Sequence, residues 1–312
     1  MKIIFMGTPD FSAVVLEKLN SVYPVSAVVT APDKPTGRGY ALKPSALKVK
    51  AEELNIPVLQ YEKVSKEGIE DIKKLMPDLI VTAAFGQILS EEFLSIPKYG
   101  VLNVHASLLP KYRGSSPIQH AILNGDSETG ITIMRTVKAV DAGDILLQTR
   151  TSIGDKETAG ELFDRLAILG GEAIIEAVKL LESGKAVFVK QDENSATHCS
   201  MISKADGKID FNRTAKELDC FVRGMSPWPS AYTKLNGKTL KIFEIEAIGD
   251  NAEKTAQKCG IVVAADAKNG LVVAVKDSAL IRLKSIQLEG ASRMSDVDFL
   301  RGRKIEVGTV LG

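Results

Sequence analysis

The sequence predicts an α/β protein in two parts, and three observations lead to this prediction. Apolar runs typical of buried strands alternate with amphipathic helical runs over the first two thirds of the chain, which is the pattern of a doubly wound, mostly parallel sheet. Beyond residue 190, short β-rich runs predominate, as in a small barrel. A length of 312 residues is enough for two ordinary domains. We therefore expect a Rossmann-like domain over residues 1–190, a polar linker over 191–207 and an OB-like barrel over 208–312.

Hydrophobic periodicity locates the elements of the first part. Strands are expected where apolar residues run together, at residues 2–6, 25–30, 58–60, 78–84, 101–105, 132–137 and 144–148. Helices are expected where apolar residues recur every three or four positions, from residue 8 onward and at residues 43–55, 65–75 and 158–182. A further helix begins at Ser116, a suitable N-cap followed by Pro117, and ends at Gly125.

The second part is predicted to be built from short strands. The dipeptide Asn236-Gly237 separates two alternating segments within residues 232–243, which is a strong signal for a two-residue hairpin turn. Further strands are expected at residues 261–265, 271–275 and 280–286, and helices at 215–224 and 295–301.

Composition narrows the class of protein. Hydrophobic residues make up 45% of the chain and charged residues 25%, which is typical of a globular protein. The three cysteines are widely spaced and match no zinc or disulfide pattern, which favours a reducing compartment. The first apolar run is too short for a signal peptide, and no run approaches the length of a membrane span. We expect a monomeric, cytoplasmic protein without a metal centre or a membrane partner.

Charge is unevenly distributed along the chain, although the net charge is only +1. Residues 33–50 carry five Lys and Arg against one Asp, and residues 206–312 carry 17 Lys and Arg against 14 Asp and Glu. A basic island on a nearly neutral protein is suited to a local anionic partner. A solvated loop followed by a lysine-rich helix face explains the same island equally well.

The predicted strand 101–105 carries two polar residues, Asn103 and His105, on one face, because side chains alternate along a strand. The chain then enters a loop bounded by Pro and Gly, and ligands of open α/β sheets usually bind beside such loops. Either residue alone would most often be structural. Together, an amide donor and an imidazole at the end of a strand form a candidate catalytic pair.

A third candidate is Asp141, in the acidic turn Val140-Asp-Ala-Gly-Asp144. A carboxylate beside an imidazole fixes the orientation of the ring, and an amide N–H can stabilise an oxyanion. The segment Gly7-Thr-Pro-Asp-Phe11 lacks the glycines of a dinucleotide-binding fingerprint, and the sequence contains no phosphate loop, HExxH or nucleophile elbow. These residues therefore favour acyl transfer through a tetrahedral intermediate, by direct attack of an amine.

Several motifs now carry a resemblance that extends along essentially the whole chain. The segment from Asn103 to Gly114, Thr-Gly-Ile-Thr at residues 129–132 and the acidic turn at residues 140–144 resemble the folate-dependent formyltransferase superfamily. Phe-Met-Gly-Thr-Pro-Asp-Phe at residues 5–11, Pro-Asp-Lys-Pro-Thr-Gly-Arg-Gly at 32–39 and Met-Ser-Pro-Trp-Pro at 225–229 resemble the branch that acts on a tRNA.

The resemblance implies transfer of a formyl group from 10-formyltetrahydrofolate to the α-amino group of methionine on initiator tRNA. It implies that the domain over residues 1–190 is catalytic and that the barrel over 208–312 contacts the tRNA. Site residues follow by position: Asn103, His105 and Asp141 as catalytic residues, Ser107, Leu108, Leu109 and Pro110 as folate contacts, and Arg38 with Lys43 as tRNA contacts.

Two other functions remain open at this point. A related formyltransferase could act on a small amine, such as a nucleotide-linked amino sugar or glycinamide ribonucleotide, with the same three catalytic residues and no tRNA surface. A protein without activity that only binds RNA or folate could keep the fold. The basic island and the β-rich second part count against the first alternative, and the intact trio counts against the second.

Overall fold

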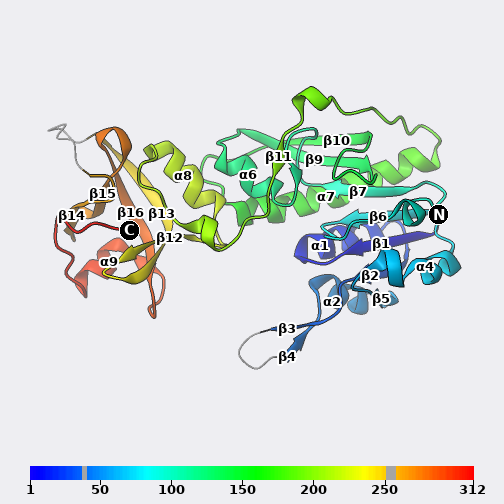
Figure 1. The fold of residues 1–312 in the computed structure, drawn as a ribbon, viewed down its shortest axis with the longest axis horizontal. Helices are drawn as coiled ribbons and strands as arrows, with labels where there is room; N and C mark the ends of the chain where they lie inside the picture. The colour runs from blue at the N-terminus through cyan, green and yellow to red at the C-terminus, as the bar shows by residue number, and fades with distance from the viewer. Residues whose placement is uncertain (37–40, 251–257) are drawn as a thin grey trace. The chain divides into compact units, whose positions relative to one another are not determined.

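The structure is a computed structural model that describes residues 1–36, 41–250 and 258–312 (Figure 1). The chain divides into two compact units. Unit 1 consists of Met1–Pro117, Glu128–Ser152 and Leu162–Ser200. Unit 2 consists of Ile118–Ser127, Ile153–Glu161 and Met201–Gly312.

Unit 1 is built on a seven-stranded sheet with the order β10-β9-β7-β6-β1-β2-β5. The strands are β1 (Ile3–Gly7), β2 (Val25–Thr30), β5 (Val58–Gln60), β6 (Leu79–Ala83), β7 (Val101–His105), β9 (Glu128–Arg135) and β10 (Ile145–Ser152). The pairs β5·β2, β2·β1, β1·β6 and β6·β7 are parallel, whereas β9 is antiparallel to both β7 and β10. The first part of the chain therefore forms the expected mostly parallel sheet, with an antiparallel pair at one edge.

Helices follow the strands in chain order. They are α1 (Asp10–Asn20), α2 (Ala46–Glu53), α3 (Val64–Glu67), α4 (Ile69–Leu75), α5 (Glu91–Leu94) and α7 (Ala159–Glu182), whose first three residues belong to unit 2. Helix α7 packs closely on β7, because a Cβ at Gly170 would lie 2.9 Å from a methyl carbon of Val104. Among the residues that the structure describes, no helix is both long and apolar enough to cross a membrane.

Two helices differ from the sequence prediction. The helix expected over residues 43–55 begins only after Ser45, whose hydroxyl accepts a hydrogen bond from the backbone N–H of Lys48. Lys43 instead ends β4 (Ala41–Lys43), which pairs with β3 (Lys34–Thr36). The residue before a proline disfavours helical backbone angles, and Pro44 therefore excludes Lys43 from the helix. The helix expected over residues 65–75 is divided at Gly68 into α3 and α4.

Unit 2 is β-rich, and its main sheet has the order β12-β13-β16-β15-β14, with β17 paired to β16. Its strands are β12 (Ala231–Leu235), β13 (Lys238–Asp250), β14 (Val262–Asp266), β15 (Gly270–Ala274), β16 (Ala279–Leu288) and β17 (Met294–Ser295). Unit 2 also contains helices α6 (Pro117–Leu123, from Ile118 onward), α8 (Ala215–Gly224) and α9 (Asp296–Arg301) and the 3-10 turns η2 (Ala205–Gly207) and η3 (Lys276–Ser278). Asn236 and Gly237 have φ values of 48° and 80°, as the predicted hairpin turn requires.

Candidate active site

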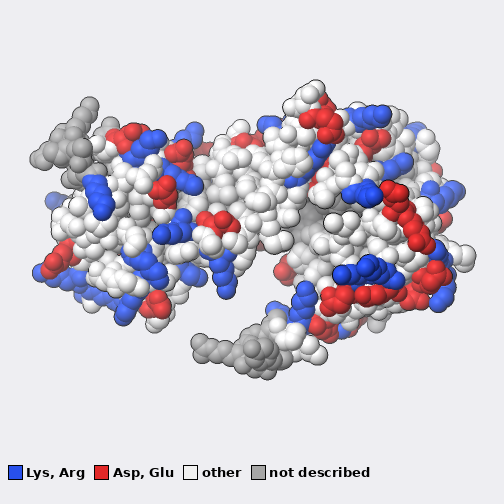
Figure 2. All heavy atoms as spheres, viewed as in Figure 1, with Lys and Arg blue, Asp and Glu red and all other residues white. Residues whose placement is uncertain are grey.

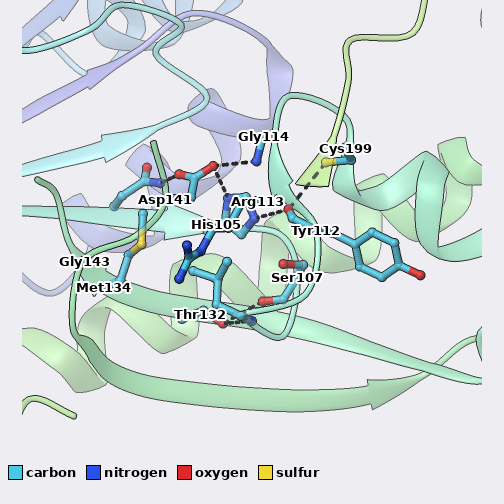
Figure 3. Close-up of polar contacts among 12 residues, drawn as sticks. His105, Ser107, Tyr112, Arg113, Gly114, Thr132, Met134, Asp141, Gly143 and Cys199 are labelled. Atoms are coloured by element: carbon cyan, nitrogen blue, oxygen red, sulfur yellow. Dashed lines mark hydrogen bonds and ion pairs between the residues drawn. The ribbon is translucent and has the colours of Figure 1, made fainter. Parts of the chain in front are cut away.

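Asn103 and His105 lie in strand β7, which pairs in parallel with β6. Figure 3 shows His105 beside Asp141. Val104, between them, faces Gly170 of α7, so the two polar side chains point to the opposite side of the sheet. Strand β9 pairs with β7 in antiparallel register, with Asn103 opposite Met134 and His105 opposite Thr132. The alternation that the sequence predicts therefore places an amide and an imidazole side by side.

The buried imidazole of His105 is held at both ring nitrogens. Nε2 lies 2.9 Å from the backbone oxygen of Tyr112, and Nδ1 lies 3.6 Å from Oδ2 of Asp141. A carbonyl oxygen can only accept a hydrogen bond, so Nε2 carries a hydrogen and donates it to Tyr112. Nδ1, which faces the carboxylate, is then the nitrogen that can gain or lose a proton.

Asp141 lies in the turn between β9 and β10, at a φ of 49°, in the left-handed region. Its carboxylate accepts hydrogen bonds from the backbone N–H of Gly114 at 2.8 Å and from Nδ2 of Asn103 at 3.4 Å. These contacts bring Asn103, His105 and Asp141 into one cluster, although Asp141 is 36 positions beyond His105 in the sequence.

Thr82, buried in the neighbouring strand β6, determines which way the Asn103 amide faces. The Thr82 hydroxyl lies 2.9 Å from Oδ1 of Asn103, to which it donates, and 3.3 Å from the backbone oxygen of Leu102. On the other side, the Asp141 carboxylate can only accept, so it requires the Nδ2 end of the amide. Both neighbours select the same orientation, with the N–H donors on the side of Asp141 and His105.

Replacing Thr82 with Val should lower kcat for the reaction at this site by about 3- to 10-fold, the rate equivalent of one neutral hydrogen bond. The substitution keeps the shape of the side chain and removes the donor that orients Asn103. Steady-state kinetics of Thr82→Val and Thr82→Ser would measure the effect. The serine variant keeps the hydroxyl and should retain near-native turnover, and equal losses in both variants would contradict the proposed orientation.

The loop after β7 contains residues 107–110, which the resemblance identifies as folate contacts, and the last strands of the sheet hold it in place. The Thr132 hydroxyl donates to the backbone oxygen of Ser107 at 2.6 Å and accepts from the N–H of Leu109 at 3.1 Å. Gln148 on β10 donates to the backbone oxygen of Leu109 at 2.8 Å. Ser107 and Leu109 are buried, so partly exposed side chains in the loop come from Leu108 and Pro110.

Of the two predicted tRNA contacts, Arg38 lies outside the described residues, and Lys43 is exposed at the end of β4. Two other cations of the basic island are ion-paired. Lys48 lies 2.7 Å from Asp33, whose pKa it lowers by hydrogen bonding, and Lys50 lies 2.9 Å from Glu53. The simple count of positive charge over residues 33–50 therefore overstates the charge available to an anionic partner.

Sequence reasoning missed a second layer of the site, centred on Arg113. This residue is only 4% exposed and lies in β8 (Arg113–Gly114), which pairs with β11 (His198–Cys199). Its guanidinium donates to Oε1 of Gln191 and to both carboxylate oxygens of Glu193. Glu193 is the first residue of the 3-10 turn η1 (Glu193–Ser195), and its hydrogen bond raises the pKa of Arg113. Gln191 and Glu193 belong to the segment 191–207 that the sequence analysis interprets as a linker. No periodicity or motif connects this segment with Arg113.

A formyl transferase family model matches residues 1–178, and a model of the formyl transferase C-terminal domain matches residues 201–304. The fold is similar to that of WlaRD, a sugar 3N-formyl transferase solved in the presence of dTDP and 5-N-formyl-THF, with a TM-score of 0.66 at 20% identity over 94% of this chain and 99% of that chain. It is also similar to HypX from Aquifex aeolicus in complex with tetrahydrofolic acid, with a TM-score of 0.62 at 16% identity over 99% of this chain and 50% of that chain. At these identities, the likeness establishes a shared fold.

Sequence similarity to other relatives is much higher and spans the full chain. The proteins named methionyl-tRNA formyltransferase in Bacillus cereus (strain B4264) and Bacillus anthracis (strain A0248) are each 46% identical over 314 residues. Each alignment covers 100% of this chain and 99% of the relative. The family models and these full-length relatives together show that the chain belongs to the formyl transferase family.

Proposed function

We propose that the chain transfers the formyl group of 10-formyltetrahydrofolate to the α-amino group of methionine on initiator methionyl-tRNA. The observation that carries the proposal is the cluster of Asn103, His105 and Asp141, which can polarise an acyl group and move a proton. The acceptor and donor are proposed from the full-length relatives, whose name states that they act on methionyl-tRNA.

Each predicted site residue has a proposed role. Asn103 donates from Nδ2 to the formyl oxygen, and His105 moves a proton at Nδ1. Asp141 holds the imidazole and stabilises its cationic form. Residues 107–110 contact the folate, and two cations, Arg38 and Lys43, contact the tRNA.

The reaction proceeds by direct transfer. The uncharged α-amino nitrogen attacks the formyl carbon, a C–N bond forms, and the oxygen of the tetrahedral intermediate becomes an anion that Asn103 and protonated His105 stabilise. The bond from carbon to N10 of the folate then breaks. The proton lost by the attacking amine passes to N10, with His105 Nδ1 as the shuttle, so the products are formyl-methionyl-tRNA and tetrahydrofolate.

The nearby thiol and hydroxyl are poor candidates for a covalent nucleophile. Burial raises the pKa of the Cys199 thiol, which donates to the backbone oxygen of Tyr112. The Ser107 hydroxyl is buried and donates to the backbone oxygen of Lys111 at 2.6 Å. A neutral thiol is a weak nucleophile, which supports direct attack by the substrate amine.

Cys199→Ala should therefore retain kcat within about threefold, because a nucleophile essential to catalysis would cost orders of magnitude. The same steady-state assay measures the effect, with thermal unfolding as the control for loss of the buried sulfur. A loss of about 100-fold or more in a stably folded variant would contradict direct transfer.

We further propose that residues 1–190 form the catalytic domain, that residues 191–207 connect it to the next domain and that residues 208–312 form an OB-like barrel that contacts the tRNA. Backbone hydrogen bonds of the C-terminal residues support closure of the barrel. The N–H of Gly312 donates to the backbone oxygen of Lys234 in β12, and the backbone oxygen of Thr309 accepts from the N–H of Val262 in β14. These two strands are the opposite ends of the sheet. On the face of unit 2 seen in Figure 2, Lys and Arg are interspersed with Asp and Glu. We also propose a cytoplasmic monomer.

A choice among acceptors tests the proposed function. The protein and 10-formyltetrahydrofolate would be incubated separately with initiator methionyl-tRNA, a dTDP-linked amino sugar and glycinamide ribonucleotide. We expect kcat/KM to be highest for methionyl-tRNA by several orders of magnitude. Preferential formylation of the sugar or ribonucleotide would contradict the proposal.

A further inference from the structure

The side-chain amide of Gln191 uses all of its hydrogen-bonding groups to bridge two segments of the site. Oε1 accepts from Nε and Nη2 of Arg113 at 3.0 and 2.9 Å. Nε2 donates to the backbone oxygens of Asp141 and Gly143, each at 2.8 Å. A primary amide has two N–H donors and an oxygen with two lone pairs, so these four bonds satisfy it fully.

The chemistry of the partners allows only one orientation of this amide. Arg113 can only donate, and the two backbone oxygens can only accept. Glutamate at position 191 could accept from Arg113 but could not donate to the turn, and a hydrocarbon side chain could do neither. The site therefore requires both ends of an amide at this position.

The bridge acts on the backbone of Asp141, while a different group holds its carboxylate. Gly114, the residue directly after Arg113, donates its N–H to Oδ2 of Asp141 at 2.8 Å. The left-handed φ of Asp141 is disfavoured for a residue with a side chain, so this conformation depends on contacts such as these. Gln191 and Gly114 together attach the turn to β8 at two points.

We propose that Gln191 is a positioning residue that holds the turn at residues 141–143 against Arg113, so that the Asp141 carboxylate stays beside His105 and Asn103. Its effect on catalysis rests on the proposed function. The bridge itself is a property of the folded chain and can be tested without any substrate.

The variant that separates the two halves of the bridge is Gln191→Glu. It keeps an oxygen that accepts from Arg113. It replaces the two N–H donors with a carboxylate oxygen, which cannot donate to the backbone oxygens of Asp141 and Gly143. We expect kcat for formyl transfer to fall by about 10- to 100-fold, because misplacement of a catalytic group by about 1 Å can cost that much. KM for methionyl-tRNA and for the folate donor should stay within about threefold, since Gln191 contacts neither in this account.

Asn20→Asp is a matched control for the added charge in unit 1. Asn20 accepts from the N–H of Val25 through its side-chain oxygen at 2.9 Å, and aspartate preserves that bond. This control should retain native kcat within about twofold. A comparable loss of kcat in the control would overturn the specific role of Gln191.

A double-variant cycle and hydrogen exchange complete the test. In an Asp141→Asn background, Gln191→Glu should lower kcat by less than threefold, because the group that it positions is already disabled. Amide exchange over residues 138–143 should accelerate in Gln191→Glu. Native kcat in a folded Gln191→Glu variant, or an equal loss in both backgrounds, would overturn the inference. If the native protein does not formylate methionyl-tRNA, the proposed function is wrong. The bridge is tested independently of that result, because unchanged amide exchange over residues 138–143 in Gln191→Glu would show that Gln191 does not hold the turn.

Discussion

His105→Ala should lower kcat for formyl transfer by about 10²- to 10⁴-fold, the usual contribution of a positioned general acid–base group. The imidazole lies between the backbone oxygen of Tyr112 and the carboxylate of Asp141, and alanine supplies neither a proton nor a positive charge at the oxyanion. The measurement is the initial rate of formyl-methionyl-tRNA formation at saturating donor. KM for tRNA should change little, because the loss is in the transition state.

Chemical rescue and folding controls make this prediction specific. The alanine substitution leaves a space the size of the ring, so added imidazole should restore part of the lost rate in a concentration-dependent manner. Thermal unfolding should show that the variant remains folded. Activity within about threefold of native, without added imidazole, would contradict the role of His105.

Asp141→Asn should lower kcat by about 10²-fold or more, because a neutral amide no longer stabilises the imidazolium. Asparagine can still accept from the N–H of Gly114, so the turn should keep its position. Glu128→Gln removes an exposed carboxylate of unit 1, paired with Arg150, and serves as the matched control with near-native activity. Equal activity of the two variants would mean that the charge of Asp141 is not needed for turnover.

The pattern of polar and apolar residues over short stretches of sequence was sufficient to predict the elements that carry the candidate residues. Alternation along β7 placed Asn103 and His105 on one face, and Asn236-Gly237 predicted the turn between β12 and β13. Both features depend on residues adjacent in sequence, and the physics that determines them is short-range. The antiparallel attachment of β9 to β7 depends instead on which edge of the sheet the returning chain joins, and periodicity carries no information about that choice.

The part of the site that could not be predicted consists of polar contacts between distant segments. Arg113 and Gln191 are 78 positions apart, and the residues around Gln191 have the polar composition of a linker. The same limit applies to charge, because the ion pair of Lys48 with Asp33 joins residues 15 positions apart, and the more distant Gln60 donates to the same carboxylate. Side-chain hydrogen bonding of this kind leaves no periodic signal in the sequence.

The most direct test of the account is a single turnover with 10-formyltetrahydrofolate labelled in the formyl carbon and excess enzyme over initiator methionyl-tRNA. We expect label to pass from the folate to the methionine α-amino group at one rate, with no labelled protein at any time. In His105→Ala, this rate should fall by at least about 10²-fold. Label trapped on the protein before it reaches the tRNA, or an unchanged rate in His105→Ala, would contradict direct transfer by Asn103, His105 and Asp141.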